Sequence, residues 1–143
     1  MPGKYPMLQL RGRANTVIEW QVKQAQDDLF QSLGVICPLI RFEKDESIGD
    51  GSTEFVLNGE TVERLGLFDT PNLTQHAPDL VTEGLVDRYL GQLTETYPDL
   101  VRVVKERFPI EGLTALLREK VAAKVSIRNL PSVLEDLLAE SPR

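Results

Sequence analysis

Residue types that perform catalysis or bind metals are scarce in this chain. Its 143 residues include one histidine, His76, and one cysteine, Cys37. A catalytic histidine needs a hydroxyl, thiol or carboxylate partner within hydrogen-bonding reach, and no serine, cysteine or aspartate motif is placed to provide one. We therefore expect His76 to be a solvated or capping side chain rather than a base. Cys37 lies in the apolar run Val35–Ile40, which predicts a buried and unreactive thiol.

The acidic residues Asp45, Glu46 and Asp50 lie in a polar, glycine-containing segment, an arrangement that invites comparison with calcium loops. Their spacing departs from the Asp-x-Asp-x-Asp-Gly pattern, and the glutamate that ends such a loop is missing. No glycine-rich loop opens a predicted helix, so a phosphate site is not predicted either. The sequence thus predicts no metal, no cofactor and no catalytic residue, and we expect that the protein is not an enzyme.

The elements of the first half indicate a small sheet packed with one helix. Between residues 17 and 33, apolar side chains recur every three to five positions, as on one face of a helix that Gly34 would end. Asn58-Gly59 separates two alternating segments, and this dipeptide favours the tight turn of a β-hairpin over residues 53–65. Two further short strands are predicted over residues 5–11 and 35–42.

The second half is predicted to be helical. Residues 69–78 contain two prolines and several turn-forming polar residues, which indicates a linker. Apolar stripes beyond it predict four helices, over residues 79–97, 98–108, 110–121 and 129–138. The expected fold is α+β, with a sheet-and-helix lobe over residues 1–68 that includes the hairpin, a linker over 69–78 and a four-helix lobe over 79–143.

A second kind of function stays open near the linker. A small hydrolase or ligand-binding domain could assemble its site there from scattered polar side chains such as His76, Asp79 and Asp45. Titratable residues elsewhere are spread along helix faces, which favours the non-enzymatic interpretation.

Charge is distributed unevenly along the chain. The net charge of −6 at pH 7 argues against nucleic acid as the main partner. Residues 41–99 carry four basic and 13 acidic side chains (net −9), whereas residues 100–128 carry seven basic and three acidic ones (net +4). Solvated helix faces explain such a pattern, and so does head-to-tail association of copies into a ring or an open chain. The longest apolar run, Val35–Ile40, is too short to span a membrane, and no signal-peptide pattern opens the chain, so we expect a cytoplasmic protein without membrane insertion.

Four residues are candidates for contacts with a partner or with another copy. Arg128 precedes the last predicted helix, where it either bonds the carbonyls that end the helix before it or contacts a partner protein. Lys120 and Lys124 belong to the same basic region and are expected to attract the acidic part of a second copy. Trp20, the only tryptophan, is expected to pack in the core or at its rim, or else to anchor a partner.

Three short phrases in the last third of the chain carry a resemblance to a known family. They are Thr-Tyr-Pro-Asp-Leu-Val at residues 96–101, Leu-Leu-Arg-Glu-Lys-Val at 116–121 and Val-Ser-Ile-Arg-Asn-Leu-Pro-Ser-Val-Leu-Glu at 125–135. Their order and spacing resemble the soluble part of the FHIPEP family, the large export-gate proteins of flagellar and virulence-type (type III) secretion systems. More weakly, residues 29–41 and 55–60 resemble that family's helix end, following strand and next tight turn.

The resemblance implies an interaction scaffold rather than a complete export gate. Family members carry an N-terminal half of several membrane spans and a cytoplasmic part of four subdomains. Between Leu67 and His76 this chain has only a few residues where the family inserts a whole subdomain, and it stops soon after Leu138. It therefore resembles the first and third subdomains joined directly, and the lack of a tag after Met1 favours a standalone relative. The resemblance implies protein partners, a docking or adaptor role, and a weak, ring-like homo-oligomer built through the third subdomain.

Overall fold

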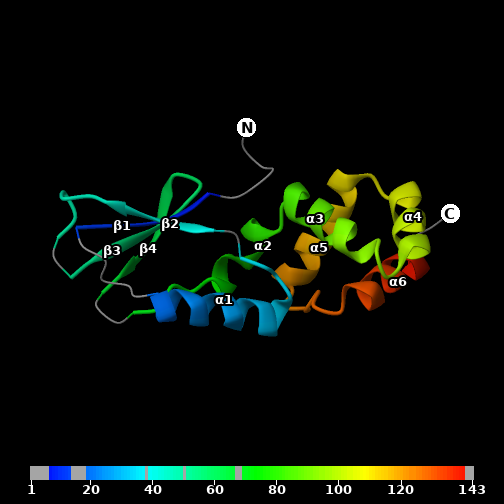
Figure 1. Cartoon of the computed structure of the whole chain (residues 1–143), viewed down its shortest axis with the longest axis horizontal. Coiled ribbons are helices and arrows are strands. Elements are labelled where there is room, and N and C mark those ends of the chain that lie inside the picture. The colour runs from blue at the N-terminus through cyan, green and yellow to red at the C-terminus, as the bar shows by residue number, and fades with distance from the viewer. Residues whose placement is uncertain (1–6, 14–18, 38, 50, 67–68, 141–143) are drawn as a thin grey trace.

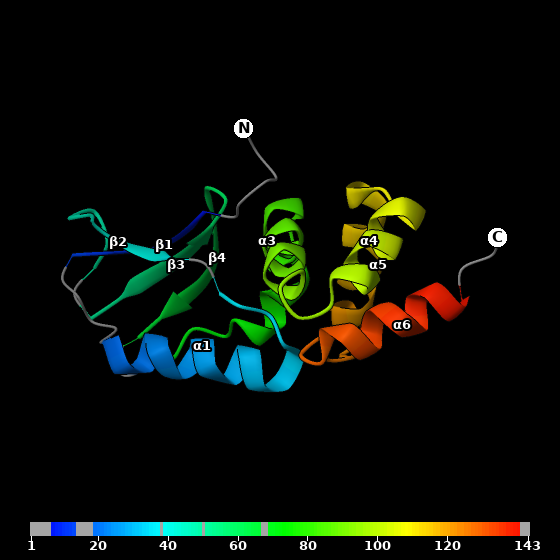
Figure 2. The same cartoon turned by 45° about the vertical axis from the view of Figure 1, so that its right-hand side comes forward.

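The computed structural model describes residues 7–13, 19–37, 39–49, 51–66 and 69–140, with the backbone alone at residues 19 and 20. It confirms the predicted α+β class. In chain order the elements are β1 (Leu8–Gly12), α1 (Glu19–Leu33), β2 (Ile40–Lys44), β3 (Thr53–Leu57), β4 (Glu60–Leu65), η1 (Thr74–His76), α2 (Ala77–Leu80), α3 (Glu83–Leu93), α4 (Pro98–Arg107), α5 (Ile110–Ala122) and α6 (Leu130–Glu140). Figures 1 and 2 show the sheet at one end of the molecule and α3 to α6 at the other, with α1 running along the sheet toward the helices.

The four strands form one sheet in the order β2-β1-β3-β4. β2 is parallel to β1, and the other neighbouring pairs are antiparallel. The predicted hairpin is present, because β3 and β4 flank Asn58 and Gly59, whose φ angles of 52° and 87° suit a type I′ turn. The strand predicted over residues 35–42 begins later, at Ile40, because Val35 is fully buried outside the sheet, in the connection from α1.

One hydrophobic core runs from the sheet into the helices. On the sheet, Leu10 pairs with Phe55 across β1 and β3, so the two side chains lie on the same face. α1 adds Ala25 and Leu29 to the cluster that contains them. The helical end contributes leucine and valine side chains at helical spacing, among them Leu85, Leu90, Val104, Leu113, Leu117, Leu134 and Leu137. The sheet, α1 and the helices therefore share apolar contacts rather than separate cores.

The segment predicted as a linker contains regular structure. η1 and α2 lie within or next to residues 69–78, and Leu73, Ala77 and Leu80 are buried in the common core. The helix predicted from residue 79 is broken after α2, because the Thr82 hydroxyl accepts a hydrogen bond from the Leu85 N–H and starts α3 anew. The division into lobes at residues 68 and 79 stays a prediction.

The remaining helix boundaries follow the prolines, as predicted. α4 begins at Pro98, Pro109 is the N-terminal cap of α5, and Pro131 is the second residue of α6. Proline suits these positions because the first N–H groups of a helix have no acceptor within the helix. Four helical segments thus follow residue 82, and residues 125–127 between α5 and α6 have no regular secondary structure.

Candidate partner-binding site

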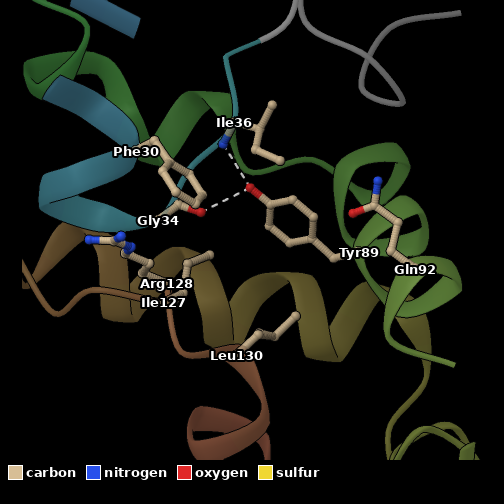
Figure 3. Close-up of a pocket in the computed structure, with 8 residues that line it drawn as sticks. All are labelled: Phe30, Gly34, Ile36, Tyr89, Gln92, Ile127, Arg128 and Leu130. Carbon is tan, nitrogen blue, oxygen red and sulfur yellow. Dashed lines mark hydrogen bonds between the residues drawn. The ribbon is translucent and has the colours of Figure 1, made fainter. Parts of the chain in front are cut away.

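A pocket of about 210 Å³ opens where the end of α1 meets α3 and the segment between α5 and α6. Figure 3 shows its lining, which has an apolar floor and polar groups at the side. The lining residues are Phe30, Gly34, Ile36, Tyr89, Gln92, Ile127, Arg128 and Leu130. They come from three stretches separated by more than 30 residues each, so only the folded chain brings them together.

Tyr89 of α3 holds one wall of the pocket in place through hydrogen bonds. Its hydroxyl donates a hydrogen bond to the carbonyl oxygen of Gly34 at 2.9 Å and accepts one from the Ile36 N–H at 2.7 Å (Figure 3). The residue is buried, and burial is the main reason that the pKa of the phenol is raised above its ordinary value. The hydroxyl is therefore neutral at physiological pH and acts as both donor and acceptor, which holds the chain after α1 against α3.

Gly34 allows the opposite wall to approach closely. The residue has a φ of +74°, and a Cβ built on it would lie 2.1 Å from the backbone nitrogen of Arg128. On the same side, the Ile127 N–H donates to the carbonyl oxygen of Leu33 at 2.9 Å. The end of α1 is thus in direct backbone contact with the segment before α6, and the position requires glycine for both conformation and space.

Arg128 is the charged group of the pocket. Its guanidinium lies over the Phe30 ring, 5.4 Å from the centroid, and donates to the side-chain oxygen of Gln31 at 2.6 Å. These contacts go to α1, so the expectation that Arg128 bonds the carbonyls ending the preceding helix is wrong. Those carbonyls are occupied by backbone N–H groups of residues 123–125. Within the described residues Arg128 forms no ion pair, so its charge is free to meet an acidic group of a partner.

The other candidate contact residues do not join Arg128 at the pocket. Lys120 is half-buried in the last turn of α5, and Lys124 is exposed just beyond it, with a φ of 66° that ends the helix. Trp20 lies outside the described side chains. The sequence therefore predicted one of the eight pocket residues, Arg128. The helix end at Leu33-Gly34 was the only local sign of the backbone contact between α1 and the segment before α6.

His76 is packed rather than solvated or capping, which corrects the expectation drawn from the sequence. Its ring meets the Phe55 ring edge-on, with centroids 5.9 Å apart and planes at 79°. Its Nε2 is buried and forms no hydrogen bond with any described residue, and the side chain makes no cap at the start of α2. Asp79 is exposed on α2. No hydrogen bond among the described residues links His76 to Asp79 or to Asp45.

Asp45 and Cys37 have environments of their own. Asp45 lies in the β2–β3 loop, beside a polar depression that Arg11, Glu54 and Arg64 also line. The hydroxyl and the N–H of Ser47 donate to its carboxylate and lower its pKa. Cys37 is half-buried, and burial raises the pKa of its thiol to about 11, which supports the predicted unreactive thiol. Among the residues that the structure describes, no group of three or more His, Cys, Asp or Glu side chains is arranged to hold a metal.

Comparison with known proteins agrees with this architecture. The chain matches no family model. It is similar in structure to the Shigella flexneri MxiA protein, with a TM-score of 0.75 and 16% identity over 96% of this chain and 58% of that one. The Chlamydia pneumoniae CdsV protein gives a TM-score of 0.79 with 14% identity over 97% and 67% of the two chains. The nonameric EscV cytosolic domain from a type III secretion system gives 0.75 with 14% identity over 100% and 61%. The predicted resemblance to the export gates is confirmed.

A relative in sequence agrees with these structures. A probable translocation protein, y4yR, of Sinorhizobium fredii (strain NBRC 101917 / NGR234) is 38% identical over 71 residues, which are 50% of this chain and 10% of the relative. The matched half of the chain thus covers about a tenth of that protein, and the chain covers about three fifths of the MxiA and EscV structures. None of the helices in the described part of the chain is both long and apolar enough to cross a membrane.

Proposed function

We propose that this protein is a non-enzymatic docking module, an adaptor or scaffold of the cytoplasm that serves protein export. The similarity in fold to export-gate cytosolic domains and in sequence to a translocation protein supports this assignment. The resembled structures include nonamers and a complex of CdsV with a second protein, CdsO, so protein partners and self-association are in keeping with the fold.

The pocket around Arg128 is the observation that carries the proposal. Its floor of Ile127 and Leu130 is apolar, while the guanidinium at its side has no acidic partner among the described residues. A protein segment with an apolar side chain next to a carboxylate satisfies both features. Arginine is among the residues that most often dominate binding energy at interfaces, because its planar fork pairs with a carboxylate through two hydrogen bonds.

Self-association is proposed to be weak and electrostatic. The acidic region, residues 41–99, and the basic region, residues 100–128, differ in net charge by 13 units, −9 against +4. Exposed ion pairs contribute only about 0–1 kcal/mol each. Association between copies should therefore rise with protein concentration and fall with salt, because screening shortens to about 3 Å at 1 M ionic strength.

Light scattering across a salt series tests the proposal. Arg128→Glu, and Lys120→Glu combined with Lys124→Glu, should each weaken association. The double lysine variant should leave the melting temperature unaltered, whereas Arg128→Glu also loses the contacts with Phe30 and Gln31 and should lower it. Lys23→Glu is a matched control, since Lys23 is exposed on α1, outside the basic region, and the change in charge per residue is the same. A protein that is monomeric at every concentration and every salt would remove the ring and leave a one-to-one adaptor. An oligomer insensitive to salt, to Arg128→Glu and to the double lysine variant would mean an apolar interface elsewhere.

A further inference from the structure

β2 is an outer strand whose second edge pairs with no other strand in the described part of the chain. The sheet order places it beyond β1, and among the described residues no backbone hydrogen bond crosses its outer edge. Four of its five side chains are exposed, and only Ile40 is half-buried. A strand edge of this kind offers a row of free N–H and C=O groups to another strand.

Apolar side chains accompany this open edge. Phe42, at the centre of β2, is 41% exposed, and Leu39, just before the strand, is 75% exposed. In the register with β1, Phe42 lies beside Leu10, which is buried, so the aromatic ring marks the point where the core reaches the edge of the sheet. An added strand would cover this ring as well as satisfy the backbone.

We infer that the strand which pairs here is β2 of a second copy of this chain, antiparallel and centred on Phe42. The N–H and C=O groups of successive residues in a strand point alternately to its two edges. In an antiparallel pair of identical strands, the two-fold axis therefore passes between two copies of the same residue and not between neighbouring residues. In the pairing centred on Phe42, Arg41 of each copy lies opposite Glu43 of the other copy, and Ile40 lies opposite Lys44. All five residues of β2 are paired, and two Arg41–Glu43 pairs flank a central pair of phenylalanines.

The neighbouring registers place like charges together. A pairing centred on Arg41 would set two arginines opposite each other, and one centred on Glu43 would set two carboxylates opposite each other. Like charges at directly opposite positions destabilise a strand pair, whereas opposite charges stabilise it. The order Arg-Phe-Glu in the middle of β2 thus selects one register of self-pairing.

The two charged groups are available for such a contact. Arg41 forms no hydrogen bond or ion pair in the described part of the chain. The side chain of Glu43 is 48% exposed; one oxygen accepts from the Gln9 Nε2 at 2.7 Å, and the other lies 3.8 Å from the Arg11 Nε. That second oxygen keeps lone pairs for a partner's guanidinium. Arg41 and Glu43 also lie on the same face as Gln9 and Arg11, so pairing would extend a polar ladder across both sheets.

The contact is short, so the dimer is weak and depends on concentration. Pairing five residues buries far less than the roughly 1,000 Å² expected of a stable interface. It also differs in kind from the head-to-tail contact proposed above, because it joins the same surface of both copies. Arg128 and the two lysines take no part in it.

Site-specific cross-linking tests the pairing. In a Cys37→Ser chain, Phe42→Cys should form a disulfide-linked dimer under mild oxidation with copper phenanthroline, because facing residues of antiparallel strands have Cα atoms about 4.5–5.5 Å apart, within disulfide reach. Lys44→Cys is the matched control on the same strand. Its copies would be separated by four residues along the strand, roughly 14 Å, which is too far.

Charge reversal provides the second arm of the test. Arg41→Glu, added to the Phe42→Cys chain, should slow cross-linking at least about tenfold by placing two pairs of carboxylates together, while Lys23→Glu should leave it unchanged. The inference is overturned if Phe42→Cys and Lys44→Cys cross-link at equal rates, if Arg41→Glu has no effect, or if no dimer forms at millimolar protein. The last result would leave the edge to a strand from a different protein.

Discussion

The hydroxyl of Tyr89 lies 2.9 Å from the carbonyl oxygen of Gly34, a hydrogen bond that joins residues 55 positions apart. It connects α3 to the end of α1 at the wall of the pocket that contains Arg128 (Figure 3). The geometry of that pocket therefore depends on a contact between the sheet-bearing half of the chain and the helical half.

Replacing Tyr89 with phenylalanine should destabilise the protein by about 1–3 kcal/mol, because the buried Gly34 carbonyl and the Ile36 N–H lose their partner. Urea unfolding followed by circular dichroism measures the change. Tyr97→Phe is the control, since Tyr97 is 45% exposed and should change the free energy of unfolding by less than about 0.5 kcal/mol. Equal effects of the two variants would show that the hydrogen bonds of the Tyr89 hydroxyl do not stabilise the fold.

Gly34→Ala should be more damaging than its backbone conformation alone predicts. Gly34 and Gly51 have nearly the same φ, +74° and +76°, but a Cβ at Gly34 would collide with Arg128 whereas one at Gly51 meets nothing within 4 Å. Gly51→Ala should therefore cost about 1–2 kcal/mol for the left-handed conformation, and Gly34→Ala about 3 kcal/mol or more. The melting temperatures of the Gly34→Ala and Gly51→Ala variants would separate the cost of the left-handed conformation from the cost of the collision with Arg128. Similar losses would mean that α1 and the segment before α6 are not in contact.

The buried leucine side chains of the helices should not tolerate replacement by a charged residue. Leu134→Asp or Leu117→Asp should destabilise the protein by about 3 kcal/mol or more, because both side chains are fully buried and the new carboxylate would have no partner. Leu39→Asp is the control on an exposed leucine. A Leu134→Asp variant that melts within a few degrees of the parent would contradict the packing of α6.

The thiol of Cys37 should react slowly at neutral pH. With a pKa of about 11 instead of 9.0, roughly 0.1% of the thiol is ionised at pH 8, and alkylation by iodoacetamide should speed up about tenfold per pH unit toward pH 11. The raised pKa means that the fold favours the neutral thiol, so its contribution to stability is complete below pH 9.0 and is lost as the pH rises toward 11. Alkylation in urea provides the unfolded reference. A folded rate equal to the urea rate would show that the thiol is exposed.

The sequence by itself determined the features that depend on neighbouring residues. Asn58-Gly59 specified the hairpin because the turn needs two positive φ angles. Pro98, Pro109 and Pro131 marked helix starts because proline fixes φ and lacks an N–H that the first turn does not use. The phrases around residues 96–135 carried the resemblance to the export gates, which the fold confirms.

Only the tertiary structure decided which of these elements touch. The break between α2 and α3 depends on the Thr82 cap and on Arg118, whose guanidinium donates to the Val81 carbonyl from α5 at 2.7 and 3.2 Å. The packing of His76 on Phe55 and of Arg128 on Phe30 likewise joins residues 21 and 98 positions apart. Periodicity reports which face of an element is apolar, but the partner of that face is chosen by packing across the whole core. The pocket, made where α1, α3 and the segment before α6 meet, therefore has no signature in any single stretch of the sequence.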